Sequence, residues 1–301
     1  RVTFQLKSAV ASAFQADTIF GHLCWAKRYL DGEDGLTKEF LEWYGKDVGL
    51  PPILISDGFP CDLLPRPLTP PREPTSGSKQ EQIEAYDKQK DLKSIQFLSP
   101  DEFNLAIHGK AFEPTKKDSM SKKNVTSKNQ INRLTGTTGE GGQLFEFEET
   151  WERTPVSIYV KVANGFEDEA ERLFRFVAEQ GYGKRKSVGY GAIKSMDFQP
   201  FDGFRPPADA NGYISLSHFV PAKDDPREGC WKVLVKYGKL GEEYAAGENP
   251  FKRPLVMLAP GSVFRTEGKP KEFYGRLVPD ISSKDGVVQY AFAFPVPMKI
   301  V

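Results

Sequence analysis

The stretch of this sequence best equipped for chemistry is "GYGKRKSVGYGAI", residues 181–193. A Gly-Tyr-Gly triplet stands at each end, and three cations and a serine lie between them. Glycines let another backbone approach closely, while cations, free amides and hydroxyls are the groups that bind phosphate. The pattern therefore predicts either a phosphate-binding loop or a solvated loop whose glycines serve only its turns.

A mononucleotide does not fit this loop. A Walker loop ends in Gly-Lys-Ser/Thr, but Arg185 precedes Lys186 here, and the dinucleotide pattern fails because Lys186 stands where its third glycine belongs. Both nucleotide motifs also place phosphate at the start of a helix. This loop instead leaves the end of a predicted helix (167–180), where the helix dipole disfavours an anion.

A polynucleotide fits better. The loop offers charge for backbone phosphates, amides for phosphate oxygens, and aromatic rings for unpaired bases. We expect Tyr182 and Tyr190 to be available for base stacking. The candidate phosphate-binding residues of the loop are Gly183, Lys184, Arg185, Lys186, Ser187, Gly189, Tyr190 and Gly191.

Regular elements must position this loop. Alternating patterns predict strands at 2–6, 53–56, 142–149 and 154–162, and another after the loop. Apolar stripes predict a helix at 16–30, with Ile19, Leu23, Ala26 and Leu30 buried and Asp17 as its cap, and a second at 167–180, with Ala170, Leu173, Phe174 and Val177 buried.

This order predicts an α+β protein with a ferredoxin-like βαββαβ unit in residues 1–200. A large insertion at about 72–130 interrupts the unit, with a loosely held helix at about 79–93. The proline-dense run after residue 56 excludes a regular helix or central strand there. Residues 201–301 are rich in strand patterns and predict a second, more irregular α+β domain.

Bulk composition narrows the class of protein. The 301 residues carry no net charge, and no run of about 18 apolar residues predicts a membrane span. The three cysteines (Cys24, Cys61, Cys230) include no Cys-x-x-Cys pair, and no local set of ligands predicts a metal or cofactor. We expect a cytoplasmic protein that binds nucleic acid through local patches only.

One such basic patch lies in the insertion. Between Lys110 and Arg133 there are seven cations and two acids, giving a local charge of +5. Few apolar groups accompany them, so we expect residues 109–130 to be mobile unless a partner orders them. The candidate RNA-binding residues in and beside this patch are Lys122, Lys123, Lys128, Asn132 and Arg133.

Two segments together resemble a known family. The loop "GYGKRKSVGYG" between helix and strand resembles the glycine-rich loop of the RAMP superfamily of CRISPR RNA-binding proteins. "INRLTGTTGEGGQLFEFEETWERTPVSIYVKV" (131–162) is similar to the segment before the central strands of those proteins. "FQADTIFGHLCWA", "ISDGFPCDLLPRP" and "SLSHFVP" narrow the resemblance to the family of fourth Csm subunits of type III-A CRISPR effector complexes.

The resemblance implies two ferredoxin-like domains and a non-catalytic subunit that holds the 5′ tag of a guide RNA. It further implies three partners besides that RNA: a large polymerase-like subunit, an adjacent backbone RAMP subunit, and target RNA near a protruding thumb. The basic stretch 109–130 is the candidate thumb. Lys184, Arg185 and Lys186 are implied to contact tag phosphates.

Two alternatives stay open. Some RAMP relatives cut RNA with a histidine, so His22 could make this chain a metal-independent RNA-processing endonuclease. His22 also stands beside an apolar stripe, which favours a packed or hydrogen-bonded core histidine over a catalytic one, and it is a candidate RNA contact as well. His218, within a predicted strand, could contact RNA or be structural. The chain could also be a scaffold that touches no RNA.

Overall fold

The computed structural model describes residues 1–45, 49–68, 70, 78–117, 120–129, 131–138 and 144–301. Its first sheet has four strands, in the order β2-β7-β1-β8, and every neighbouring pair is antiparallel. These strands are β1 (Val2–Leu6), β2 (Ile53–Pro60), β7 (Val156–Val162) and β8 (Ile193–Phe198).

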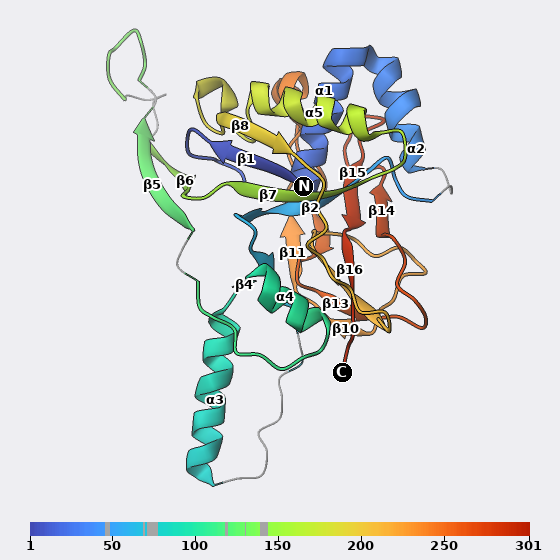
Figure 1. Ribbon diagram of the computed structural model, residues 1–301. Helices are drawn as coiled ribbons and strands as arrows, with labels where there is room; N and C mark the ends of the chain where they lie inside the picture. Colours follow the sequence, from blue (N-terminus) through green and yellow to red (C-terminus); the bar gives the residue numbers. More distant parts are fainter. Residues whose placement is uncertain (46–48, 69, 71–77, 118–119, 130, 139–143) are drawn as a thin grey trace.

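Two helices lie on one face of this sheet (Figure 1). α1 (Ala16–Asp34) connects β1 to β2, and α5 (Glu167–Gln180) connects β7 to β8. Each helix thus joins two parallel strands that have one antiparallel strand between them. The predicted buried stripe of α5 is confirmed. In α1 the stripe is confirmed except for Leu30, which is 40% exposed.

The predicted cap of α1 is wrong. The first backbone N–H of the helix, at Ala16, donates to the carboxylate of Asp57 on β2 at 2.9 Å. Asp17 instead accepts from Lys236 (3.0 Å) and Gln289 (2.5 Å), two residues that lie more than 200 positions further along the chain. The helix start is therefore satisfied by a tertiary contact, which local spacing does not reveal.

The insertion is more regular than expected. Strand β2 runs through the proline-dense segment to Pro60, which an edge strand tolerates. Residues 121–129 form a strand, so the basic stretch 109–130 is partly regular. The strand predicted at 142–149 forms from Leu144 onward, but it pairs with residues 121–129 and is not part of the first sheet. The elements between β2 and β7 are β3 (Leu64–Pro65), α3 (Lys79–Ser94), β4 (Phe97–Leu98), α4 (Pro100–Ile107), β5 (Ser121–Asn129) and β6 (Leu144–Glu152).

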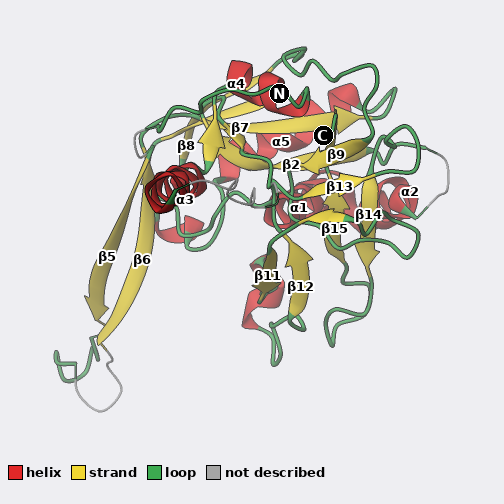
Figure 2. Ribbon diagram, turned by 90° about the horizontal axis from the view of Figure 1, so that it is seen from below, coloured by secondary structure: helices red, strands yellow, loops and turns green. Residues whose placement is uncertain are grey.

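Strands β5 and β6 form a hairpin that projects from the body (Figures 1 and 2). Helix α3 also projects, as expected for a loosely held helix, and Figure 2 shows it end-on. Between α1 and β2 the chain continues as the π-helix η1 (Gly35–Leu41) and the short α2 (Glu42–Tyr44).

Residues 201–301 are almost entirely β structure. Throughout this segment the one helical element is the 3-10 turn η3 (Glu242–Ala246), so the expectation of an α+β domain is wrong in its helical part. One four-stranded sheet has the order β10-β13-β9-β16, and two ribbons pair β11 with β12 and β14 with β15. The strands are β9 (Gly212–Ser215), β10 (Gly229–Cys230), β11 (Val233–Lys236), β12 (Leu255–Leu258), β13 (Val263–Arg265), β14 (Tyr274–Val278), β15 (Gln289–Ala293) and β16 (Pro295–Met298).

Residues 1–200 and the C-terminal part, residues 201–301, share one hydrophobic core. The largest cluster of buried residues includes Phe20 on α1 and Tyr290 on β15, whose rings lie 4.8 Å apart. The Tyr290 hydroxyl accepts the backbone N–H of Ile55, which the bulge of β2 leaves available. The C-terminal strands therefore hold α1 and the edge strand β2 of the first sheet.

Among the described residues, none of the helices is long and apolar enough to span a bilayer. The three cysteines are free thiols.

Candidate nucleic-acid interface

The glycine-rich loop (residues 181–191) is closed at its neck by backbone hydrogen bonds. Gly181, with φ of 81°, ends α5, and the Tyr182 N–H donates to the Gly191 carbonyl at 2.9 Å. The Gly191 N–H donates in turn to Ala9 at 2.8 Å. A Cβ atom at Gly191 would lie 1.8 Å from the carbonyl oxygen of Tyr182. Glycine is required there because no side chain fits between the two crossing strands of the neck.

Tyr182 is a core residue, so the expectation that it stacks on bases is wrong. Its side chain is fully buried and stacks on Phe14 at a centroid distance of 4.1 Å. Its hydroxyl donates to the carbonyl of Ala13 at 2.7 Å, and burial raises the pKa of the phenol well above its ordinary value. The inner end of the loop is thus part of the fold.

His22 positions the loop. Its Nε2 accepts the backbone N–H of Gly183 at 2.9 Å, and the next N–H, of Lys184, donates to the hydroxyl of Ser12 at 3.0 Å. Burial, and to a smaller extent the nearby charge of Lys186, lowers the pKa of His22 to about 4. His22 is therefore a neutral acceptor at neutral pH, and these contacts favour its structural interpretation.

The outer part of the loop faces solvent and carries the cations. Lys184, Arg185 and Ser187 are exposed. Arg185 has φ of 62° and precedes the 3-10 turn η2 (Lys186–Val188). Lys186 differs from its neighbours, because its ammonium is paired with Glu242 of η3 at 2.5 Å. Two of the three predicted loop cations are thus open to a ligand, and the third joins the loop to the C-terminal part.

The β5–β6 hairpin lies against this outer part of the loop. The guanidinium of Arg185 sits 4.3 Å from the ring centre of Phe147 and 5.3 Å from that of Phe145. Tyr190 meets Phe147 edge-on at 5.2 Å. Because side chains alternate along a strand, Phe145 and Phe147 share one face of β6 with Glu149 and Trp151. That face is turned toward the loop.

Lys128 completes this contact. Its ammonium lies 4.5 Å from the ring centre of Tyr190 and 4.9 Å from that of Phe147, and it donates to the Tyr190 hydroxyl. The same hydroxyl donates to Glu149 at 2.9 Å. Cations held over aromatic faces keep their charge while losing little freedom, which favours binding of an anionic chain.

The remaining hairpin candidates are spread along its length. Register pairs Lys122 with Trp151, on the loop-facing side, whereas Lys123 lies on the other side, and both are exposed. Asn132 and Arg133 lie in the connection between β5 and β6, where the Asn132 side chain accepts the N–H of Leu134 at 2.9 Å in a local turn. The structure therefore brings Lys128 to the glycine-rich loop but not Asn132 or Arg133.

His218 is far less accessible than an RNA contact would suggest. Its Nδ1 pairs with the buried carboxylate of Asp57, and its backbone N–H donates to the same carboxylate at 3.2 Å. Burial alone would lower the pKa of His218, but the Asp57 carboxylate outweighs it and raises this pKa. His218 thus joins β2 to the C-terminal part, and a structural role accounts for its contacts.

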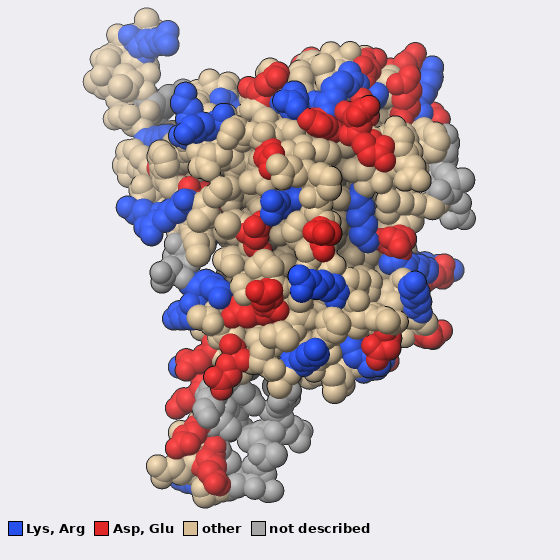
Figure 3. Space-filling model, in the orientation of Figure 1, with Lys and Arg blue, Asp and Glu red and all other residues tan. Residues whose placement is uncertain are grey.

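Sequence reasoning missed half of this interface. Phe145, Phe147, Glu149 and Trp151 were not predicted as site residues, although their spacing of two along "FEFEETW" is the signal that places them on one face. Figure 3 shows Lys and Arg side chains recurring along the edge that carries the hairpin. Across the described residues, no group of three or more potential ligands is placed to hold a metal ion.

Comparison with protein families bears directly on this site. The model of the RAMP superfamily matches residues 13–194, more than half of the chain and a range that includes both the hairpin and the glycine-rich loop. The chain belongs to the RAMP superfamily. No curated protein matches it.

The likeness to solved RAMP structures extends over the whole length of the chain. A chain of a Csm1–Csm4 cassette in complex with cA4 superposes with a TM-score of 0.64 at 17% identity, covering 100% of this chain and 98% of that one. A chain of a Csm3–Csm4 subcomplex of a type III-A CRISPR-Cas interference complex gives a TM-score of 0.65 at 16% identity, with 99% of each chain covered. At these identities the likeness shows a common fold.

Proposed function

We propose that this RAMP protein is the subunit of a type III-A CRISPR interference complex that holds the 5′ tag of the guide RNA. The observation that carries the proposal is the surface formed where the outer part of the glycine-rich loop meets the hairpin. There Arg185 and Lys128 lie over aromatic rings, and Lys184 is open to solvent. An RNA backbone has the repeated negative charge that such a surface suits.

The full-length likeness to chains of the Csm1–Csm4 and Csm3–Csm4 complexes supports the partners. Csm4 is the component that these two complexes have in common. In this proposal the chain bridges a large polymerase-like subunit to the adjacent backbone RAMP subunit, and its β5–β6 hairpin is the thumb that meets target RNA. The first sheet with α1 and α5 is one ferredoxin-like domain, and residues 201–301 form a degenerate second one that lacks the two helices.

The proposed role is binding without catalysis. A histidine that acts as general acid or base needs a free ring nitrogen and a pKa near the working pH. The Nε2 of His22 is occupied by the Gly183 N–H, and its pKa is about 4. Both facts favour a positioning role for His22 over a catalytic one.

The first test measures binding of tag-bearing guide RNA to the purified chain at several salt concentrations. Replacing Lys184 and Arg185 together with Ala is expected to weaken binding by at least about tenfold, since hydrogen bonds to charged groups contribute about 1.5–3 kcal/mol each. The slope of log affinity against log salt should become shallower by about 0.7 for each phosphate that the variant no longer neutralises. Lys269→Ala, which removes an exposed lysine from the turn after β13, is the matched control.

Unchanged affinity and salt slope in the double variant would contradict the loop assignment. If RNA does not crosslink to the chain at all, the chain is a scaffold. Incubation with precursor repeat RNA in the absence of metal tests the endonuclease alternative. Specific cleavage that disappears in His22→Ala would overturn the non-catalytic role.

A further inference from the structure

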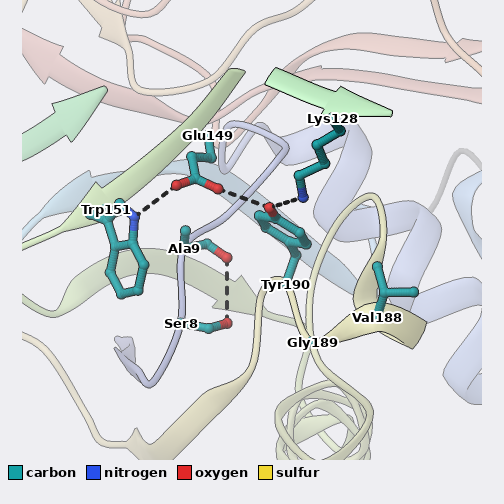
Figure 4. Close-up of a pocket in the computed structure, with 8 residues that line it drawn as sticks. All are labelled: Ser8, Ala9, Lys128, Glu149, Trp151, Val188, Gly189 and Tyr190. Atoms are coloured by element: carbon teal, nitrogen blue, oxygen red, sulfur yellow. Dashed lines mark hydrogen bonds between the residues drawn. The ribbon is translucent and has the colours of Figure 1, made fainter. Parts of the chain in front are cut away.

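An open pocket of about 350 Å³ lies where the hairpin meets the glycine-rich loop (Figure 4). Glu149 and Trp151 of β6 line one side, Tyr190 and Lys128 the other, and the backbone at Ser8 and Ala9 crosses between them. Most of the interface presents cations, as a phosphate site should. A carboxylate at this position repels phosphate and therefore calls for a different ligand group.

The carboxylate of Glu149 is held in one orientation. Its Oε2 accepts from the Tyr190 hydroxyl at 2.9 Å, and its Oε1 accepts from the indole N–H of Trp151 at 3.2 Å. These two hydrogen bonds, with smaller contributions from Asn124 and from the charge of Lys128, lower the pKa of Glu149, so it is ionised at neutral pH. An ionised carboxylate can accept about four hydrogen bonds. Tyr190 and Trp151 each occupy one position on a different oxygen, and Asn124 adds a weaker bond that a ligand with two donors must replace.

Two parallel acceptors select among the nucleobases. Guanine presents an N1–H and an N2 amino group side by side on its pairing edge, so it can donate to both oxygens of one carboxylate, as a guanidinium does. Adenine, cytosine and uracil each place an acceptor beside their donor and would set that acceptor against a carboxylate oxygen. The indole of Trp151, 45% exposed, supplies an aromatic surface next to Glu149 on which a splayed base can stack.

We infer that this pocket binds one unpaired guanine base of the RNA, with Glu149 accepting from its N1–H and N2 amino group and Trp151 stacking against it. Tyr190 is a positioning residue, since its hydroxyl orients Glu149. This inference rests on the proposed RNA-binding function and adds a base-specific contact to it. The cations bind the backbone regardless of sequence, whereas Glu149 reads a base.

The test compares matched single-stranded RNAs that differ at one position. Oligouridines carrying a single guanosine, inosine or adenosine are titrated against the purified chain. We expect about tenfold tighter binding for guanosine than for adenosine, the range of one bidentate base contact, and an intermediate value for inosine, which lacks the N2 amino group. Glu149→Gln should abolish the preference, because its amide NH₂ opposes the donors of guanine.

Glu148→Gln is the matched control, since Glu148 lies on the opposite face of the same strand. It should retain the preference for guanosine. Trp151→Leu should weaken binding of all three RNAs, and thermal unfolding of each variant verifies that it folds. RNA binding without a base preference, or a preference that survives in Glu149→Gln, would overturn the guanine pocket while leaving the proposed function standing. Binding of none of the RNAs would overturn both.

Discussion

The inner and outer parts of the glycine-rich loop each contain a tyrosine flanked by glycines, but the two tyrosines have different surroundings. The inner part, at Gly181–Gly183 and Gly191, is closed by backbone hydrogen bonds and buries Tyr182 against Phe14. The outer part, from Lys184 to Tyr190, exposes Lys184 and Arg185 and meets the hairpin. One short motif thus both completes the core and presents the surface that we propose binds RNA. Rigid attachment of the inner part means that little freedom is lost when the outer part binds.

The two tyrosines provide the sharpest test of this comparison. Tyr182→Ala should lower the free energy of unfolding by about 3–5 kcal/mol, because it removes a fully buried aromatic ring. Tyr190→Ala should cost less than about 1 kcal/mol, because Tyr190 is only partly buried, yet it should weaken RNA binding. Urea denaturation and RNA titration of both variants measure the difference. Equal losses of stability would show that the loop is not divided as described.

Substitution of Gly191 in the inner part should lower the free energy of unfolding more than substitution of Gly189 in the outer part, although the difference is smaller than for the tyrosines. Gly191→Ala is expected to cost about 3 kcal/mol, since its Cβ would meet the Tyr182 carbonyl and the backbone must move. Gly189→Ala should cost about 1 kcal/mol, because φ of 93° is strained for alanine but nothing lies within 4 Å of the added carbon. Chemical denaturation of the two variants side by side tests this, and a larger loss at Gly189 would contradict it.

Histidine titration separates by pH the contact that holds the inner part of the loop, made by His22, from the contact between β2 and the C-terminal part, made by His218. The unfolded chain protonates His22 near pH 6.5, but the folded chain only near pH 4. The contribution of His22 is therefore complete above about pH 6.5 and declines as pH falls toward 4, by about 1–3 kcal/mol. His218 has the opposite sign: its pKa is raised in the fold, so its contribution is present below about pH 6.5 and is lost as pH rises through the folded pKa.

Unfolding of His22→Gln and His218→Gln across this pH range resolves the two contributions. The His22 variant should lose the acid-side decline, because glutamine does not titrate and its carbonyl can still accept the Gly183 N–H. The His218 variant should instead change the free energy of unfolding at higher pH, where the wild-type contribution of His218 is lost. An acid-side decline that persists unchanged in His22→Gln would assign it to other groups.

Local patterns predicted the elements whose burial is periodic. The strands at 2–6 and 154–162 and the stripe of α5 alternate or recur as their contacts in the core require. Strand β5 was missed because "SKKNVTSKN" has no apolar face of its own, and only pairing with β6 makes it regular. Residues 71–77, where the predicted insertion begins, lie outside the described residues.

The residues of the candidate site also fall into those that a local pattern predicted and those that it missed. Composition alone pointed to Lys184 and Arg185, because a run of cations between glycines suits an exposed phosphate-binding loop. Glu149 and Trp151 were overlooked, since their relation to Tyr190 depends on two segments about forty residues apart being brought together. Asp57, which satisfies both the start of α1 and His218, gives no local signal of either contact.

The sequence by itself determined the order of the elements, the position of the glycine-rich loop between a helix and a strand, and the charge that the loop carries. Hydrophobic periodicity and glycine content are local properties, and they suffice for such conclusions. Only the tertiary structure decided that Tyr182 is buried while Tyr190 faces the hairpin. Each stands at the centre of a Gly-Tyr-Gly triplet, so the difference comes from Phe14 and Phe147, distant residues that the fold alone places beside them.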